Sequence, residues 1–437
     1  MNTRSIRKIV VLGANGAMGA SSGAVFAAAG IPTVFLARTL AKAEAGRARA
    51  EQLTRGSCGN AITCGTYVED LGTALADADL VFEAVAEDAA TKRAVFTLID
   101  ALRRPDAIVA TVSSGLSIAG LCAGMSASFQ RHFLGVHFFN PPTVIVGCEL
   151  VAHAGTDPGV RAAVRAFLTS VLGREVVETA DTPAFAGNRL GFKVLNHVAQ
   201  LAEEHGVAFM DQLVGPHTGR ALPPLATIDL VGWDVHQAIV DNLWATTADA
   251  AHAHFALPAY MQRGIARGHL GRKTRDKGGF FRVEGKGADA RHLVLDPRTG
   301  DYRPVAEATP ATPRFVEDMK AAIRAGRPVA AMEVLCTAEG TAADLLREIL
   351  LGYISYGLGL VGTVVEQPRD VDRIMGFGFH WAPPSVLVDA IGPGRTIVML
   401  DRAGLPVPTP ILEAATGQRA LFNEPSVDGA RFFVVAA

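Results

Sequence analysis

The chain has 437 residues, of which 49% are hydrophobic and 19% are charged. This composition supplies ample material for a folded core and excludes an intrinsically disordered chain, which needs low hydrophobicity and high net charge. At roughly 150 residues per domain, the length predicts two to three domains. The 41 basic and 43 acidic side chains nearly cancel, so the net charge gives no general attraction to nucleic acid or to an acidic membrane.

The sequence indicates neither a membrane span nor a secretory signal. The uncharged run near Tyr353–Val365 is shorter than the ~20 apolar residues that a spanning helix needs. The apolar part of the basic N-terminus covers only Ile9–Leu12, which fits a first β-strand better than a signal peptide. Five cysteines without a CxxC pair are typical of reduced thiols. We therefore expect a soluble, cytoplasmic protein, with no membrane and no nucleic acid among its partners.

The first part of the chain alternates strand and helix signals. Short apolar runs are separated by segments long enough for crossover helices, a pattern that predicts a parallel sheet covered on both faces. The predicted strands are Ile9–Leu12, Pro32–Ala37, Leu80–Val85, Ala107–Val112 and Leu134–Phe138.

From about Thr182 the pattern changes to helices. In Phe185–His205, apolar residues recur at steps of three and four, as on one face of a helix. The predicted fold class is α/β, a Rossmann-like doubly wound parallel sheet followed by two tandem all-α domains. The expected divisions are a dinucleotide-binding domain over 1–182, a helical domain over 183–285, a linker over 286–311 and a second helical domain over 312–437.

The second helical domain repeats the sequence pattern of the first. The matching segments are Asp211–Gly232 and Asp372–Gly392. A Pro-Pro pair, an aspartate and a glycine recur at a separation of 160 residues, at Pro223, Pro224, Asp229 and Gly232 and again at Pro383, Pro384, Asp389 and Gly392. One register shared by all these landmarks indicates a duplicated helical module.

A glycine-rich turn follows the first predicted strand and precedes a helix. Glycines permit a tight turn and let the backbone approach a pyrophosphate, whose charge the amides of a helix N-terminus can hold. The spacing is GxxGxxG rather than the usual GxGxxG, but its place between strand and helix favours a dinucleotide site. The candidate cofactor-binding residues of this turn are Gly13, Gly16, Ala17, Met18 and Gly19.

The end of the second predicted strand bears on which dinucleotide binds. An NAD-binding fold usually places an acidic residue about 20 residues after the glycines. Arg38, followed by Thr39, stands there instead. A guanidinium with a neighbouring hydroxyl suits a 2′-phosphate, which a carboxylate would repel. The cofactor is therefore expected to be NAD(P), with NADP(H) favoured and NAD not excluded.

Motifs farther along the chain resemble those of the 3-hydroxyacyl-CoA dehydrogenase family. HFFNP begins at His137, Glu149 lies 12 residues after that histidine, and DTPxFxxNR covers Asp181–Arg189. The segments VFEAVAED at Val81–Asp88 and GHLGRKT at Gly268–Thr274 also match the family. The duplicated helical module is similar to the dehydrogenase half of bacterial multifunctional fatty-acid oxidation proteins, here without a hydratase domain.

The resemblance implies an oxidoreductase that interconverts a 3-hydroxyacyl-CoA and a 3-oxoacyl-CoA. His137 would be the general acid/base and Glu149 its orienting carboxylate, while Ser114 and Asn188 would hydrogen-bond the substrate oxygen. This chemistry suits the residues, because histidine exchanges protons near neutral pH and a buried carboxylate stabilises the imidazolium. Positions near the nicotinamide and its ribose would be Val85, Ala86, Glu87, Lys92 and Asn140.

Several positions depart from the family pattern. Val112 replaces the asparagine expected beside the catalytic serine, which leaves Ser113 as an alternative to Ser114. Two other functions stay open: a dehydrogenase of a non-CoA hydroxy acid, and a non-catalytic nucleotide-binding protein on the same fold. No metal site is expected, because His252 and His254 are two residues apart and face different sides of a helix.

The duplication also bears on assembly. Short members of the family pair through their helical domains, as the resemblance implies. A second helical copy could cover the same apolar face within one chain, since such a face must be buried by a copy or by a partner. We expect residues from about 312 to pack against 185–285 as an internal pseudo-dimer, in a chain that is monomeric or homodimeric.

Overall fold

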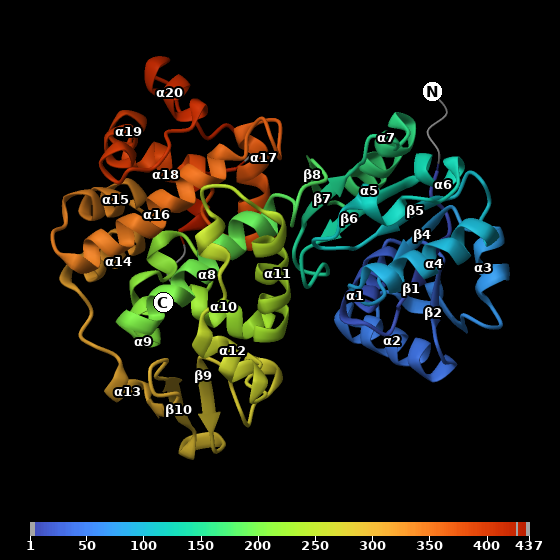
Figure 1. The fold of residues 1–437 in the computed structure, drawn as a ribbon, viewed down its shortest axis with the longest axis horizontal. Coiled ribbons are helices and arrows are strands. Elements are labelled where there is room, and N and C mark those ends of the chain that lie inside the picture. Colours follow the sequence, from blue (N-terminus) through green and yellow to red (C-terminus); the bar gives the residue numbers. More distant parts are fainter. Residues whose placement is uncertain (1–4, 425–426, 434–437) are drawn as a thin grey trace. The chain divides into compact units, whose positions relative to one another are not determined.

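The computed structural model describes residues 5–424 and 427–433. The chain divides into two compact units, Met1–Phe185 and Ala186–Ala437 (Figure 1). The division falls three residues after the boundary expected from the sequence, inside the DTPxFxxNR motif. Among the described residues, no helix combines the length and apolar character needed to cross a membrane.

An eight-stranded sheet forms the centre of the first unit, in the order β3-β2-β1-β4-β5-β6-β7-β8. Strands β1 to β6 are parallel, β7 runs antiparallel to β6, and β8 is parallel to β7. The strands are β1 (Ile9–Leu12), β2 (Thr33–Ala37), β3 (Ile62–Thr66), β4 (Leu80–Glu83), β5 (Ile108–Thr111), β6 (Phe133–Phe138), β7 (Gly147–Val151) and β8 (Glu175–Thr179).

The sequence predicted five of these strands and missed β3, β7 and β8. Polar residues or glycine interrupt each missed strand so that no more than two strongly apolar residues stand together, a weaker signal than the apolar runs of strands such as β1. Strand β7 is nevertheless completely buried and includes Glu149. The predicted parallel sheet is therefore a mostly parallel one, with its last two strands reversed.

Helices cover both faces of this sheet, as a doubly wound fold requires. On one face, Phe26 packs edge-on against Phe82 with ring centroids 5.1 Å apart. On the other face, Phe96 packs against Phe133 at 5.0 Å. The helices are α1 (Ala17–Ala28), α2 (Leu40–Leu53), α3 (Leu71–Ala76), α4 (Ala89–Leu102), α5 (Ile118–Cys122), α6 (Ala127–Arg131) and α7 (Pro158–Ala166).

The second unit is mainly helical. Its first part contains α8 (Gly187–His205), α9 (Val207–Leu213), α10 (Pro224–Val231), α11 (Trp233–Thr246) and α12 (Ala259–Ala266). Its last part contains α14 (Arg314–Arg324), α15 (Pro328–Thr337), α16 (Thr341–Gly359), α17 (Pro368–Arg373), α18 (Pro384–Ile391), α19 (Pro393–Arg402) and α20 (Thr409–Thr416).

Along the sequence, a small antiparallel sheet comes between these two groups of helices. Strand β10 (Arg291–Leu295) pairs with β9 (Phe281–Glu284) on one side and with β11 (Tyr302–Pro304) on the other. Helix α13 (Val305–Ala308) follows directly. The segment interpreted from the sequence as a linker therefore contains regular structure, which its short and strongly charged strands did not reveal.

The repeated landmarks of the helical unit have the same structural roles. Helices α10 and α18 each begin at the second proline of a Pro-Pro pair, and each ends at a glycine with positive φ, 102° at Gly232 and 96° at Gly392. Asp229 accepts hydrogen bonds from the backbone N–H groups of Phe280 and Phe281, and Asp389 accepts the corresponding pair from Leu421 and Phe422. The two aspartates thus bind the backbone of equivalent segments, at 280–281 in the first module and at 421–422 in the second.

Contacts join the two groups of helices. Arg189, near the start of α8, donates through Nε to the Tyr356 hydroxyl of α16 at 2.8 Å. Its guanidinium also pairs with Asp249 at 2.7 Å, and Tyr356 donates to the same carboxylate oxygen. The backbones of Arg220 and Trp381 form an isolated antiparallel β-bridge. The guanidinium carbon of Arg220 lies 4.0 Å from the centroid of the Trp381 ring.

Candidate active site

His137 and Glu149 form a directly opposed pair on neighbouring strands. They are register partners in the antiparallel pairing of β6 with β7, and His137 Nδ1 lies 2.6 Å from Glu149 Oε2. Opposed residues of an antiparallel pair project to the same face, so the strand pairing itself brings the two side chains together. The spacing of 12 residues in the sequence therefore reflects a strand, a connection and a returning strand.

Burial gives this pair its chemical character. Glu149 is completely buried and His137 is 5% exposed, with the rings of Phe139 and Phe185 against the imidazole at 5.0 and 5.8 Å between centroids. Because an ionised carboxylate only accepts, Nδ1 is the donor in this hydrogen bond. The other ring nitrogen, Nε2, takes no part in this contact.

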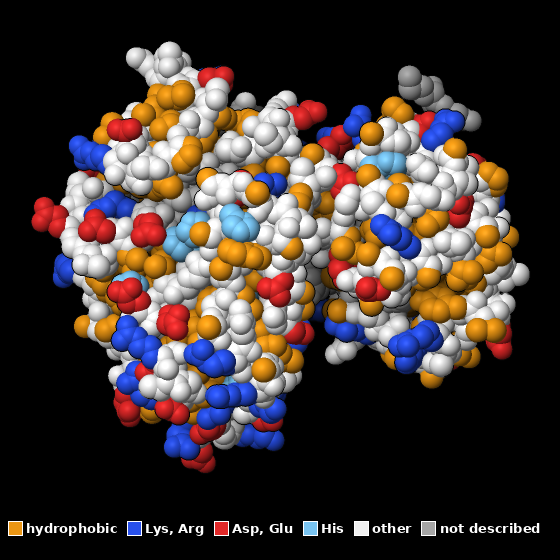
Figure 2. Space-filling model, in the orientation of Figure 1, with side chains coloured by type: hydrophobic (Ala, Val, Ile, Leu, Met, Phe, Trp, Pro, Cys, Tyr) orange, Lys and Arg blue, Asp and Glu red, His pale blue; other side chains and the backbone are white. Residues whose placement is uncertain are grey.

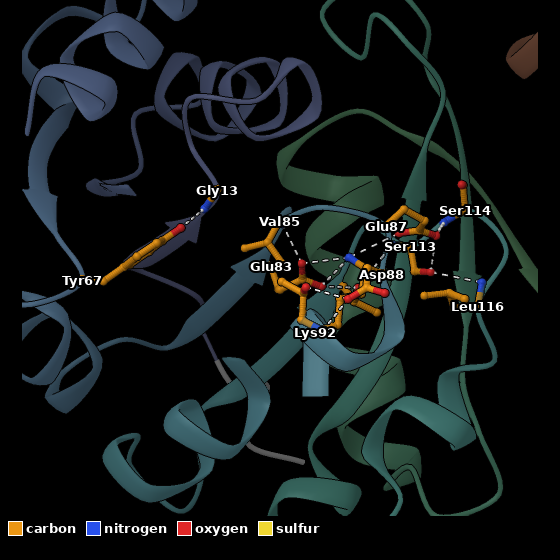
Figure 3. Close-up of polar contacts among 12 residues, drawn as sticks. Gly13, Tyr67, Glu83, Val85, Glu87, Asp88, Lys92, Ser113, Ser114 and Leu116 are labelled. Atoms are coloured by element: carbon orange, nitrogen blue, oxygen red, sulfur yellow. Dashed lines mark hydrogen bonds and ion pairs between the residues drawn. The ribbon is translucent and has the colours of Figure 1, made fainter. Parts of the chain in front are cut away.

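A network of buried charges lies at the end of β4 (Figure 3). The Lys92 ammonium, completely buried on α4, donates to both oxygens of Glu83 at 2.8 and 2.9 Å. It also lies 3.3 Å from Glu87 Oε2. Thr111 on β5 donates to Glu83 at 2.6 Å, and the Val85 N–H donates at 2.7 Å. These contacts fix the loop that follows β4.

Glu87 links this network to the two candidate serines. The Ser113 hydroxyl and the Ser114 N–H both donate to Glu87 Oε1, at 2.6 and 2.8 Å. Although desolvation opposes ionisation, the nearby Lys92 ammonium and these hydrogen bonds lower the pKa of the Glu87 carboxyl. Ser113 is buried, whereas Ser114 is partly exposed at the end of β5. Glu87 thus binds the hydroxyl of Ser113 but the backbone N–H of Ser114.

The glycine turn packs tightly between β1, β4 and α1. Gly13 has φ of +79°, and a Cβ there would lie 2.3 Å from the Ala84 carbonyl oxygen. A Cβ on Gly19 would lie 2.3 Å from the Gly13 carbonyl oxygen. Gly16 is the N-cap of α1 and offers no side chain to its first N–H groups, so the exposed Ala17 and neighbouring Met18 begin a helix that a phosphate could cap.

Tyr67 contributes a contact at this turn that the sequence did not suggest. Its hydroxyl oxygen accepts the Gly13 N–H at 2.8 Å. Tyr67 lies just after β3, one of the strands that lacked a clear apolar pattern. No motif marked it, because its role depends on how β3 lies beside β2.

Arg38 and Thr39 lie at the carboxyl end of β2. Both are exposed, and the Thr39 hydroxyl caps α2 by accepting the Lys42 N–H at 3.4 Å. Among the described residues, Arg38 forms no ion pair with a carboxylate. Its charge is thus available to an anion bound at this edge of the sheet.

The remaining predicted residues lie in different parts of the chain. Ala86 and Asn140 are exposed in the loops after β4 and β6. Asn188 is buried near the start of α8 and belongs to the second unit, whereas the other candidate residues belong to the first. Within the described segments, no cluster of three or more His, Cys, Asp or Glu residues could hold a metal ion.

Known families match both units. The family model for the NAD binding domain of 3-hydroxyacyl-CoA dehydrogenase matches residues 8–182, and the model for the C-terminal domain matches 185–280. A probable 3-hydroxyacyl-CoA dehydrogenase of Deinococcus radiodurans is 32% identical over 327 residues, which are 71% of this chain and 92% of the relative.

Two further comparisons extend over more of the chain. A probable 3-hydroxyacyl-CoA dehydrogenase of Bacillus subtilis is 31% identical over 345 residues, 78% of this chain but 42% of the relative, so the chain spans less than half of that protein. The crystal structure of 3-hydroxybutyryl-CoA dehydrogenase from Escherichia coli covers 96% of each chain with a TM-score of 0.63. At 19% identity, this likeness shows a shared fold.

The fold and the site define a nucleotide-binding α/β protein with a histidine–carboxylate pair on its sheet. The chain belongs to the 3-hydroxyacyl-CoA dehydrogenase family, a family of oxidoreductases with a NAD-binding domain. The family and fold class expected from the sequence are thereby confirmed.

Proposed function

We propose that this protein interconverts a 3-hydroxyacyl-CoA and a 3-oxoacyl-CoA with a nicotinamide dinucleotide, using His137 as the general acid/base. The observation that carries the proposal is the 2.6 Å contact between His137 Nδ1 and the buried Glu149 carboxylate. Strands β1, β4, β5 and β6 are parallel, so the glycine turn, Glu87, Ser114 and His137 all lie toward the carboxyl edge of one sheet. Ligands of open α/β sheets bind at this edge.

The residues present fit a dinucleotide. The Gly13–Gly19 turn brings bare backbone and the open start of α1 to the sheet edge, where a pyrophosphate needs them. A bound nicotinamide supplies the hydride in reduction and accepts it in oxidation. During reduction, His137 Nε2 donates a proton to the carbonyl oxygen as its carbon receives the hydride, and Glu149 holds the imidazole in the required tautomer.

Neutral donors support the same step. Ser114 and Asn188 donate hydrogen bonds to the substrate oxygen, where they stabilise the negative charge that develops during reduction. Glu87 positions the Ser114 backbone through the 2.8 Å hydrogen bond from its N–H. Lys92 acts through Glu87, because its ammonium is enclosed between two carboxylates.

NADP(H) is the proposed cofactor. Arg38 is exposed at the end of β2 and forms no ion pair among the described residues, which supports a role in holding a 2′-phosphate. An acidic residue at this position would favour NAD by accepting from the ribose hydroxyls.

An internal pseudo-dimer is also part of the proposal. The Arg189–Tyr356 hydrogen bond and the Arg220–Trp381 stacking support packing of the second helical copy against the first. A chain ending at residue 310 would then expose the covered apolar surface and aggregate or dimerise on a sizing column. A truncated chain that stayed monodisperse, monomeric and equally stable would contradict this packing.

An absorbance assay at the nicotinamide band tests the activity. The full chain is given acetoacetyl-CoA with NADPH or NADH, and we expect cofactor oxidation with a lower KM for NADPH. Acetoacetate in place of acetoacetyl-CoA should give little turnover. Turnover with the free acid alone would transfer the proposal to a non-CoA hydroxy acid, and no turnover with either would contradict it.

A further inference from the structure

A large cavity lies within the helical unit. Its volume is about 1090 Å³, slightly above the ~300–1,000 Å³ that is usual for small-molecule sites. It is formed by α9, the start of α10, the turn at 271–278, strands β9 and β10, and helix α13. None of its lining residues belongs to the nucleotide turn or to the proposed catalytic set.

One part of the wall is apolar. Phe281 and Val283 of β9 and Leu293 of β10 line the cavity beside Ala226 and Val305. The Val283 side chain, which lines the cavity, is 49% exposed. An apolar ligand group placed here would cover this side chain and gain roughly 25 cal/mol per Å² removed from water.

The other part of the wall is cationic. Arg272, Arg275 and Lys286 line the cavity, and in the described part of the chain none of the three has a carboxylate oxygen within 4 Å, although the charge of Arg272 opposes the rise in the pKa of the Asp229 carboxyl. Arg282 also lines it but is paired with Glu284, while Asp276 is an exposed acid on the same wall. Figure 2 shows Lys and Arg side chains over this region of the helical unit, near β9 and β10, with Asp and Glu side chains among them.

Two buried aspartates also line the cavity. Asp211 accepts the N–H groups of Leu225 and Ala226, and Asp229 accepts those of Phe280 and Phe281. Their oxygens are therefore occupied by the backbone, and burial raises the pKa of Asp211 to about 7 and that of Asp229 to about 6. The cavity is thus lined by four basic and three acidic side chains, an excess of one positive charge when all of them are ionised.

We propose that this cavity is a second, non-catalytic binding site for an acyl-CoA-type amphiphile, an organic phosphate that carries an apolar chain. The chain would lie against Phe281, Val283 and Leu293. The phosphates would bind Arg272, Arg275 and Lys286, since guanidinium groups form bidentate hydrogen bonds with phosphate. These three cations come from two segments of the chain. They suit a ligand with several phosphate charges better than a ligand with a single carboxylate.

Calorimetric titration of the full chain with decanoyl-CoA tests the site. The double variant Arg272→Gln/Arg275→Gln should lose one class of binding sites, or weaken it by at least about ten-fold, as charge-assisted contacts to phosphate imply. Its turnover of acetoacetyl-CoA should stay unchanged. The matched control Arg291→Gln removes an exposed charge of β10 outside the cavity and should leave the titration unaltered.

Further ligands separate the two parts of the proposal. Val283→Gln should weaken decanoyl-CoA but not CoA, because only the former carries a chain. Decanoate should bind far more weakly than decanoyl-CoA. Equal binding of decanoate, or a titration that the double variant does not change, would overturn the proposal. Because binding is read directly, a protein without acetoacetyl-CoA turnover would fail the proposed function and still test this site.

Discussion

His137 and Glu149 stand opposite each other across the β6–β7 pairing, joined by a 2.6 Å hydrogen bond between imidazole Nδ1 and carboxylate Oε2. A strand pairing fixes this contact more firmly than a loop would, since both backbones are held by ladder hydrogen bonds. The pair is completely or almost completely buried, so the carboxylate acts on the imidazole with little screening by water.

Replacing the carboxylate tests its effect on the imidazole. Glu149→Gln should lower kcat by about 10²-fold to 10⁴-fold, because the amide no longer stabilises the imidazolium. The KM for the cofactor should change less than about two-fold, since the loss falls on the chemical step. Steady-state kinetics with both substrates varied would show the split. If the KM for the cofactor rose by 10²-fold or more while kcat stayed unchanged, Glu149 would act in cofactor binding instead.

Replacing Lys92 should lower the free energy of unfolding. Lys92→Met leaves Glu83 buried without its cation and should destabilise the protein by about 3–5 kcal/mol. Urea unfolding measures the loss. Lys42→Met, on the exposed surface of α2, is the matched control and should lie within about 0.5 kcal/mol of the wild type. Similar stability of the two variants would mean that the buried network is not formed.

Arg38 should determine the preference between the two dinucleotides. Arg38→Gln should raise the KM for NADPH by about ten-fold to a hundred-fold, the loss of one charged hydrogen-bonding contact, and leave the KM for NADH nearly unchanged. Arg49→Gln, an exposed charge on α2, should change neither constant. A wild-type protein that prefers NADH would show that Arg38 does not bind a 2′-phosphate.

His236 should make the helical unit sensitive to acid. The residue is completely buried, its Nε2 lies 3.0 Å from Asn196 Oδ1, and burial lowers its pKa to about 3. Unfolding lets the imidazole take a proton below about pH 6.5, so its contribution to stability is present above that pH and is lost as the pH falls.

The wild type should therefore lose about 2 kcal/mol more than His236→Gln when the pH is lowered from 7 to 5. Urea unfolding at the two pH values gives the comparison. His292→Gln replaces an exposed histidine and should follow the wild type. Parallel losses in wild type and His236→Gln would show that His236 is already protonated in the folded state.

The parts of the fold that the sequence revealed share a simple physical signature. Strands such as β1 and β5 are buried on both faces and therefore read as continuous apolar runs. Strand β7 could not be recognised this way, because a glycine and the buried Glu149, which pairs with His137, interrupt its apolar residues. The small sheet of β9 to β11 was not predicted from the sequence for a different reason, because its strands are short and bear several charges.

The site shows the same division. The glycine turn and the HFFNP motif have local spacing that the sequence displays directly. The surroundings of Lys92 do not, because its contacts with Glu83 and Glu87 arise only when α4 packs beside the end of β4. Tyr67 was missed for the same reason, as its hydrogen bond to Gly13 joins residues 54 positions apart.

The most direct test of the central claim is the kcat/KM of His137→Ala for acetoacetyl-CoA, measured with saturating NADPH. If His137 exchanges the proton with the substrate oxygen, kcat/KM should fall by about 100-fold or more while the Kd for NADPH stays unchanged. His292→Ala, an exposed histidine of β10, should retain wild-type turnover. Undiminished turnover in His137→Ala, with a folded protein, would contradict the account.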